Sequence, residues 1–259
     1  MKIPLYHIDA FSSQVFKGNP AAVCPLSQWI DETLLQAIAS ENNLSETAFL
    51  VKIPGEYEIR WFTPAVEVDL CGHATLASGF VVMNILEPAI HSVQFQSKSG
   101  PLKVTRREGL LSLDFPSRPP NPCAMPDLLA KALGTLPIQV FSSRDYLAIY
   151  ATEEHVRNLD PDMTLLRQID RLGVIVTAPG SDCDFVSRFF APGSGIPEDP
   201  VTGSAHCTLI PYWSKRLGKT SLHAYQLSAR GGELFCEDQG ERVRISGHAV
   251  LYSEGALYL

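Results

Sequence analysis

The sequence contains the stretch Asp69-Leu70-Cys71-Gly72-His73-Ala74-Thr75-Leu76 and, in its second half, the related stretch Asp199-Pro200-Val201-Thr202-Gly203-Ser204-Ala205-His206. A matching run precedes each copy, Arg60-Trp61-Phe62-Thr63-Pro64 before the first and Arg188-Phe189-Phe190-Ala191-Pro192 before the second. The two runs lie 128 positions apart, close to half of the 259 residues. Repetition at this period predicts that one half-chain unit occurs twice and that the molecule has two similar lobes.

Both copies predict the same local structure, a strand that leads through a loop into the start of a helix. An aromatic run is followed by a loop with proline and an acidic residue, then by glycine with small residues, and then by an apolar stretch. Residues 71–74 and 202–205 would then lie where backbone N–H groups lack partners within the helix. The helix dipole adds partial positive charge there, so both helix starts could hold a carboxylate or a developing carbanion. Ordinary helix capping by Gly and Ser is the alternative.

Composition and charge exclude several classes of protein. Hydrophobic residues make up 45% and charged residues 19% of the chain, which is typical of a globular protein with an ample core. The formal net charge is −7, without the clustered Lys and Arg that phosphate contacts need, so no nucleic-acid partner is expected. The longest largely apolar stretch, 80–86, is far shorter than the roughly 20 residues of a membrane span.

The six cysteines form no Cys-x-x-Cys pair, so neither a zinc knuckle nor a redox dithiol is predicted. The opening residues 1–7 lack the apolar core of a signal peptide. We therefore expect reduced thiols and a cytoplasmic location.

The clearest linker signal is Ser117-Arg118-Pro119-Pro120-Asn121-Pro122, because three prolines in six residues disfavour helix and sheet interior. It predicts an N-terminal lobe over 1–118 and a C-terminal lobe over 119–259. The last strand could return to the first lobe, which the sequence leaves open. Apolar periodicity predicts a helix capped by Ser27 and matching helices over 75–86 and 206–217.

Glu46 lies at a predicted junction between a loop and a strand, because the apolar β-type run 48–51 follows it. The local sequence leaves two interpretations open, a functional carboxylate and a solvated loop residue. A metal site built from Cys71, His73, His206 and Cys207 is not expected, because residues one or two apart at a helix start point in different directions.

Five motifs follow one another along the chain. They are His7-x-Asp9-Ala10-Phe11, Gly18-Asn19-Pro20-Ala21, Asn43-Leu44-Ser45-Glu46-Thr47, Asp69-Leu70-Cys71-Gly72-His73-Ala74-Thr75 and Glu198-Asp199-Pro200-Val201-Thr202-Gly203-Ser204-Ala205-His206. Together they resemble the PhzF-like (phenazine biosynthesis-like) isomerase family, which shares the fold of diaminopimelate epimerase. The resemblance spans nearly the whole chain and is not specific for a substrate.

This resemblance implies an α+β fold with two pseudo-symmetric lobes, each a mixed β barrel-like sheet around a central helix. It also implies an active site in the interlobe cleft, a homodimer, and neither a metal nor an organic cofactor. The matching positions are Glu46, His73 and Asp199 for catalysis and Gly72, Thr202, Gly203, Ser204 and Cys71 for substrate binding. Among them Glu46 is the implied acid/base, and the glycines and their neighbours would supply backbone N–H groups.

One departure from diaminopimelate epimerase bears on the mechanism. That enzyme resembles a two-thiol machine with one cysteine at each helix start, whereas here Cys71 stands at the first position and Thr202 at the second. A hydroxyl is a far poorer base than a thiolate. We therefore expect single-base allylic isomerisation, in which Glu46 moves a proton along one face of a small anionic substrate. The alternatives are an epimerase or racemase of an amino-acid-like substrate with Cys71 or another polar group as second partner, and a non-catalytic metabolite-binding protein.

Overall fold

The computed structural model describes residues 1–259 and divides into two compact units. Unit 1 comprises residues 1–114 and 246–259, and unit 2 comprises residues 115–245. The chain passes between the units within β8 (Leu110–Pro116) and β16 (Arg242–Gly247). The boundary predicted at 118/119 lies four residues beyond this division, and as a limit between folding domains it stays a prediction.

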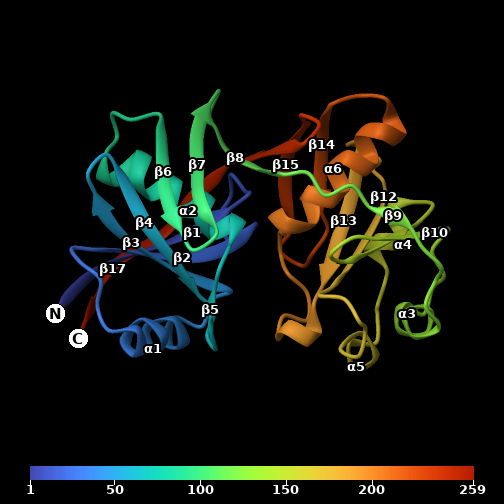
Figure 1. Ribbon diagram of the computed structural model, residues 1–259, viewed down its shortest axis with the longest axis horizontal. Helices are drawn as coiled ribbons and strands as arrows, with labels where there is room; N and C mark the ends of the chain where they lie inside the picture. The colour runs from blue at the N-terminus through green and yellow to red at the C-terminus, as the bar shows by residue number, and fades with distance from the viewer. The chain divides into compact units, whose positions relative to one another are not determined.

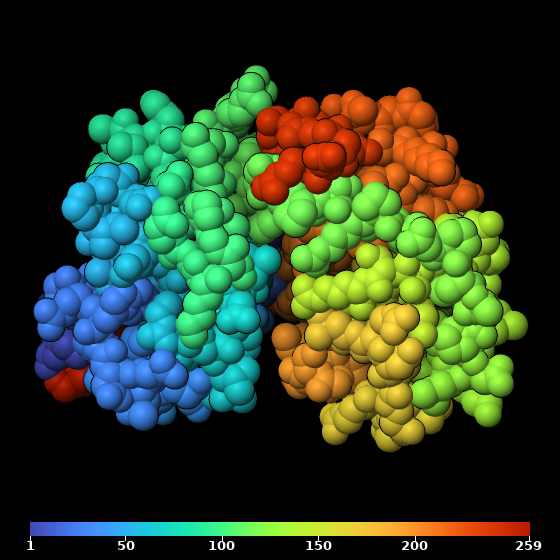
Figure 2. Space-filling view, viewed as in Figure 1, coloured from blue at the N-terminus to red at the C-terminus, as the bar shows by residue number.

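Unit 1 is built around a mixed sheet. Besides β8, its strands are β1 (Lys2–Ala10), β2 (Asn19–Leu26), β3 (Glu46–Ile53), β4 (Glu56–Phe62), β5 (Glu67–Val68), β6 (Ser92–Ser97), β7 (Gly100–Arg107) and β17 (Ala249–Tyr258). The chain's final strand does return, because β17 pairs antiparallel with β1 from Lys2↔Tyr258 to Ala10↔Ala249. The two chain ends consequently lie side by side (Figure 2).

The helix α2 (Gly72–Val81) is the centre of unit 1. It contacts β1, β2, β3, β7 and β17, so strands lie on several sides of it (Figure 1). Small residues permit this close packing: a Cβ added at Gly79 would lie 2.6 Å from Val104 Cγ1 on β7. The helix begins three residues before the predicted start at Thr75, and from Val82 to Leu86 it continues as a π-helix.

The outer helix of unit 1, α1 (Glu32–Asn42), begins later than predicted. Its N-cap is Asp31, whose carboxylate accepts the backbone N–H of Thr33 at 2.9 Å. The prediction that Ser27 caps this helix is wrong, because the Asp31 carboxylate satisfies a first-turn N–H, and residues 27–30 before it form a bend and an irregular segment.

Unit 2 repeats the topology of unit 1. Its strands are β9 (Asn121–Pro122), β10 (Gln139–Ser142), β11 (Tyr146–Ile149), β12 (Val174–Pro179), β13 (Phe185–Phe190), β14 (Ser221–Gln226), β15 (Gly232–Asp238) and β16. From β10 to β15 successive pairs alternate antiparallel, parallel, antiparallel, parallel and antiparallel. The series β1, β2, β3, β4, β6 and β7 alternates in the same way. This shared pattern confirms the two pseudo-symmetric halves of an α+β fold.

The helix that corresponds to α2 is α6 (Gly203–Leu217), since each enters after the fourth strand of its series and precedes the fifth. On α6, Trp213 is fully buried and stacks on Phe185, with ring centroids 5.7 Å apart and an interplanar angle of 2°. Its indole N–H donates to Thr177 Oγ1 at 3.0 Å. The shorter helices of unit 2 are α3 (Asp127–Leu133), α4 (Glu153–Arg157) and α5 (Met163–Leu166). Among all helices of the structure, none is both long enough and apolar enough to cross a membrane.

Candidate active site

Three of the predicted site residues meet in unit 1, and we call Glu46, Cys71 and His73 the Glu46 cluster. Glu46 is the first residue of β3, Cys71 is the N-cap of α2, and His73 is the second residue of that helix. His73 Nε2 lies 3.1 Å from Glu46 Oε2, and His73 Nδ1 lies 3.6 Å from Cys71 Sγ. The three residues are only 8%, 6% and 5% exposed, so their charges are largely withdrawn from water.

The turn before β2 brings a fourth side chain to the cluster. Gly18 adopts φ +65°, and a Cβ there would lie 2.1 Å from Ala10 O, so only glycine fits this turn. The next residue, Asn19, is fully buried and its amide lies 3.1 Å from His73 Nδ1. The atom that faces Nδ1 is the amide nitrogen, which donates to the ring while Nδ1 carries no proton; when the imidazole is protonated, a half-turn of the amide presents its oxygen as the acceptor, and either contact fixes the ring's orientation.

The pair formed by Glu46 and His73 is close without being a regular hydrogen bond. Glu46 Oε2 and His73 Nε2 are buried, and neither has a hydrogen-bond partner within the protein. At 3.1 Å the two atoms attract each other as charges but are not aligned as donor and acceptor. Glu46 therefore keeps an oxygen that is not saturated by protein donors, as a base that must accept a substrate proton requires.

Opposing influences act on His73. Burial by itself lowers its pKa, but Cys71 and Glu46 beside the ring raise it, and the pKa of His73 lies well above its ordinary value. Burial, and then the charge of Glu46, raises the pKa of the Cys71 thiol to about 11. The thiol is therefore protonated near neutral pH and carries no charge that could raise the pKa of His73 there, so the Glu46 carboxylate is the neighbour that favours the protonated ring.

The Glu46 cluster also has the composition of a metal site. One donor atom from each residue lies within 4.8 Å of the others, and thiolate, imidazole and carboxylate are all zinc ligands. The expectation that Cys71 and His73 point in different directions is wrong, because the helix begins after Cys71 and the extended N-cap turns its sulfur toward the ring. The geometric reason for not expecting a metal at Cys71 and His73 therefore does not hold.

A second group of predicted residues meets in unit 2. Thr202, the N-cap of α6, donates its hydroxyl proton to Asp199 Oδ2 at 2.6 Å. The amide of Gln226 bridges the segment: its Oε1 accepts the Thr202 N–H at 2.9 Å, and its Nε2 donates to Asp199 O at 2.8 Å and to Thr202 Oγ1 at 3.0 Å. Asp199, Thr202 and Gln226 are 9%, 6% and 1% exposed, so this polar network is buried. We call these three residues the Asp199 network.

The predicted N–H donors lie at the two helix starts. Gly72 is the first residue of α2 and Gly203 the first of α6, with half-buried Ser204 following it. Neither N-cap side chain accepts a hydrogen bond from its helix. Both starts therefore leave first-turn N–H groups for a ligand, apart from the Thr202 N–H that Gln226 already binds.

His206 and Cys207, the other two residues considered as metal ligands, form hydrogen bonds to backbone carbonyls at the start of their own helix. His206 Nδ1 bonds Thr202 O at 2.8 Å, and Cys207 Sγ donates to Gly203 O at 3.6 Å. Burial lowers the pKa of His206 to about 4, so its ring is neutral. These contacts give His206 a structural place in the core of unit 2, where its ring lies 6.0 Å from that of Phe185.

The prediction of site residues missed Asn19 and Gln226. Asn19 belongs to one of the five motifs of the family resemblance, but that resemblance gives it no role in the site. Gln226 follows Leu222 and Ala224 at the inward positions of β14, which are buried in alternation. A polar residue in such an inward register is the sequence signal that could have identified it.

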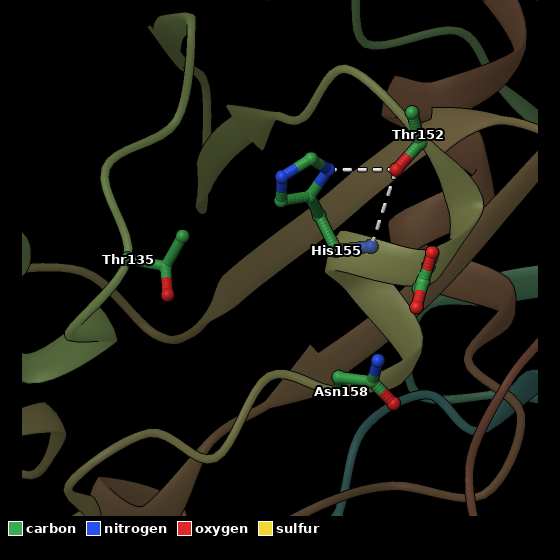
Figure 3. Close-up of a pocket in the computed structure, with 5 residues that line it drawn as sticks. Thr135, Thr152, His155 and Asn158 are labelled. Atoms are coloured by element: carbon green, nitrogen blue, oxygen red, sulfur yellow. Dashed lines mark hydrogen bonds between the residues drawn. The ribbon is translucent and has the colours of Figure 1, made fainter.

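An open cavity of about 250 Å³ in unit 2 contains none of the predicted residues. Thr135, Thr152, Glu154, His155 and Asn158 line it (Figure 3). Thr152 Oγ1 bonds the ring and backbone nitrogens of His155 and thereby caps α4. Its polar groups therefore serve a helix end, and the cavity offers no reactive pair comparable with the Glu46 cluster.

The chain is similar to known proteins over its full length. Residues 8–255 match the family described as phenazine biosynthesis-like protein (PhzC-PhzF). An uncharacterized isomerase of Pseudomonas aeruginosa is 52% identical over 259 residues, covering 100% of both chains, and one of Halalkalibacterium halodurans is 46% identical over 264 residues, again covering 100% of both. The solved structure of a PhzF family protein from Enterococcus faecalis superposes with a TM-score of 0.98 at 50% identity, covering 100% of each chain.

More distant structures share the fold alone. A hydroxyproline epimerase from Agrobacterium vitis has a TM-score of 0.62 at 10% identity, covering 99% of this chain and 92% of the other. The match over nearly the full length and the identity of its relatives show that this chain belongs to the phenazine biosynthesis-like (PhzC-PhzF) family and is an isomerase.

Proposed function

We propose that this isomerase moves a proton between carbon atoms of a small anionic substrate without a cofactor, and that Glu46 is its single acid/base. The observation that carries the proposal is the buried Glu46 Oε2, which lies 3.1 Å from His73 Nε2 and has no aligned hydrogen-bond partner in the protein. A carboxylate that is withdrawn from water, and whose Oε2 receives no aligned hydrogen bond from the protein, is suited to take a proton from carbon.

The proton shift needs two steps. Glu46 first removes a proton from a carbon next to the substrate's unsaturated or carboxylate group, and the electron pair of the C–H bond delocalises into that group. The carboxylic acid so formed then returns the proton to another carbon, which regenerates the carboxylate. Because one group takes and returns the proton, the transfer stays on one face of the substrate.

His73 has two tasks in this proposal. In its protonated form, which the neighbouring Glu46 carboxylate favours, the ring opposes the negative charge that develops on the substrate. It also holds the Glu46 carboxylate in place, while the Asn19 amide fixes the ring from the other side. Both tasks are performed by groups that need no rearrangement during the reaction.

We assign the segment from Asp199 to Ser204 to binding of the same substrate, because its sequence repeats the stretch that contains Cys71 and His73. In this assignment Asp199 is a catalytic partner, Ser204 and Thr202 bind the substrate, and N–H groups at Gly72 and Gly203 accept its negative charge. An interlobe location of the site remains part of the proposal and is supported by the family resemblance.

A second candidate reaction is epimerisation with Cys71 as the other base. The observation in its favour is the position of the thiol, 3.6 Å from His73 Nδ1. The pKa of about 11 argues against it, because the neutral thiol is a poor base near pH 7. Allylic isomerisation is therefore the preferred reaction.

Solvent deuterium decides between these reactions. A panel of cyclic dienyl acids and amino acids is incubated in D₂O with the wild type, with Glu46→Gln, and with the control Glu41→Gln, which alters an exposed carboxylate at the end of α1. We expect the wild type and the control to label a substrate and Glu46→Gln to label it about 100- to 10,000-fold more slowly. Equal labelling by Glu46→Gln would refute the assignment. The labelled carbon distinguishes a proton shift from epimerisation.

We also propose a cytoplasmic homodimer. All six cysteines are free, which is usual for proteins of a reducing compartment. The homodimer rests on the family resemblance, and light scattering of the purified protein tests it: a mass near 28.4 kDa would show a monomer and contradict it.

A further inference from the structure

The side chain of Gln226 makes more bonds to the start of α6 than to its own strand. It ends β14, where its backbone neighbours are Ser187 on β13 and Gly232 on β15. Its amide is 1% exposed and makes three hydrogen bonds, all to Asp199 and Thr202. A buried amide whose three hydrogen bonds all go to one neighbouring segment fixes the geometry of that segment.

The orientation of this amide follows from its backbone partners. A backbone N–H can only donate, so the atom that faces Thr202 N is the amide oxygen. A backbone carbonyl can only accept, so the atom that faces Asp199 O is the amide nitrogen. The same nitrogen therefore donates its second proton to Thr202 Oγ1.

This arrangement determines the direction of the next hydrogen bond. Thr202 Oγ1 accepts from Gln226, so its single proton is free to point at the other neighbour, Asp199 Oδ2, at 2.6 Å. The short distance is typical of a hydroxyl that donates to an ionised carboxylate. The hydrogen bonds therefore all run in one direction: the Gln226 amide donates to the Thr202 hydroxyl, and that hydroxyl donates to the Asp199 carboxylate.

We propose that Gln226 is a positioning residue of the isomerase, which holds the Asp199 carboxylate in its reactive orientation through Thr202 and closes the N-cap amide of α6 to other anions. The inference rests on the proposed role of Asp199. Because Gln226 occupies the Thr202 N–H, the donors left at this helix start belong to Gly203 and the residues after it.

Two variants separate positioning from packing. Gln226→Met keeps the length of the side chain and removes all three hydrogen bonds. Gln226→Glu keeps the shape but replaces both amide protons by a carboxylate, which competes with Asp199 for the Thr202 hydroxyl. The matched control is Gln139→Glu, which adds the same charge at an exposed position of unit 2.

The first measurement needs no substrate. Amide hydrogen exchange of Thr202, followed by NMR, is expected to be at least about 10-fold faster in Gln226→Met than in the wild type, since one buried hydrogen bond is lost. The control is expected to exchange as the wild type does. Unchanged exchange in Gln226→Met would overturn the inference directly.

The second measurement is the deuterium-labelling rate with the panel acid that the wild type labels fastest. We expect Gln226→Glu to lower kcat up to about 100-fold with a smaller change in KM. The reason is that a misplaced Asp199 carboxylate slows the reaction more than it weakens substrate binding. The ratio of the variant's rate to the wild-type rate at the same pH should rise as the pH falls, because the introduced carboxyl then gains a proton that it can donate to Thr202 Oγ1. A defect of packing alone would show no such recovery.

Asp199→Asn distinguishes the two levels of the proposal. If Asp199→Asn abolishes labelling while Gln226→Glu and Gln226→Met retain the full rate, the positioning role is refuted and the role of Asp199 stands. If Asp199→Asn labels at the wild-type rate, the proposed role of Asp199 fails and the positioning inference fails with it. If no panel acid is labelled, the proposed proton shift on these substrates fails, while the exchange of the Thr202 amide still decides whether Gln226 holds the loop.

Discussion

The buried imidazole of His206 should make unit 2 sensitive to acid, and His206→Asn should remove that sensitivity. The ring is completely buried, and burial lowers its pKa from 6.5 to about 4. The asparagine amide can donate to Thr202 O from nearly the position of Nδ1, but it does not titrate. The substitution therefore removes the protonation site and keeps the hydrogen bond.

The sign and size of the effect follow from proton linkage. Between pH 6.5 and pH 4 the unfolded chain binds a proton at this residue and the folded chain does not, so stability falls as the pH decreases through this range. One pKa unit corresponds to about 1.4 kcal/mol, which limits the full effect to about 3 kcal/mol. Between pH 7.5 and pH 4.5 the wild type should lose about 2.5 kcal/mol through His206 alone.

Urea denaturation at pH 7.5 and pH 4.5 measures this loss, with tryptophan fluorescence as the signal. Trp213 is a suitable reporter because it stacks on Phe185, which in turn lies beside the His206 ring. We expect His206→Asn to start less stable at pH 7.5, because it loses the ring's packing, and then to lose about 2.5 kcal/mol less on acidification. His155→Asn, which removes an exposed histidine of the same unit, is the matched control. If His206→Asn loses as much stability as the wild type, the neutral buried ring is the wrong description.

Three further predictions test other parts of the structure. The Cys71 thiol, with a pKa of about 11, should react slowly with iodoacetamide at pH 7.5, and Glu46→Gln should make it react faster because the neighbouring negative charge is gone; mass spectrometry of the labelled peptide measures both rates. Burial raises the pKa of Asp145 from 3.8 to about 6, so the ionised carboxylate destabilises the folded chain above pH 6. Asp145→Asn should therefore add about 3 kcal/mol to the free energy of unfolding above pH 6 and almost nothing below pH 4, and urea titrations at both pH values measure this. Gly79→Ala should destabilise unit 1 by about 1–3 kcal/mol, because the new methyl group would meet Val104 at 2.6 Å, and an unchanged melting temperature would contradict this close contact.

Much of the fold could be predicted because the signals are local or repeated. The echo between residues 60–76 and 188–206 predicted two similar halves, and both halves show the same alternation of parallel and antiparallel pairs. The helix starts were misplaced by three residues in α2 and in α6, since apolar periodicity begins only after the first turn has formed. The return of β17 to β1 joins residues at opposite ends of the chain, and no local pattern encodes such a pairing.

The candidate site was predicted less completely, because its contacts depend on distant residues. Glu46 and His73 were expected from motifs, but the 3.1 Å between them arises where β3 meets the start of α2. Asn19 and His73 are separated by 54 positions, and Thr202 and Gln226 by 24. Polar residues in inward register identify such partners in principle, but only the fold determines which polar groups they reach.

The two halves share one topology but have different chemistry at their helix starts, and this difference bears on the mechanism. A symmetrical two-base reaction needs a group that can accept a proton at each helix start. At the first, the Cys71 thiol has a pKa of about 11 and stays protonated. At the second, the Thr202 hydroxyl accepts from Gln226 and donates to Asp199, so its hydrogen bonds are already committed. Neither N-cap residue is suited to act as the base, which favours the proposed role of the Glu46 carboxylate. The same reasoning makes Thr202 a test of the proposal, because Thr202→Cys would restore a thiol at the second start and, under the single-base mechanism, should not introduce epimerisation.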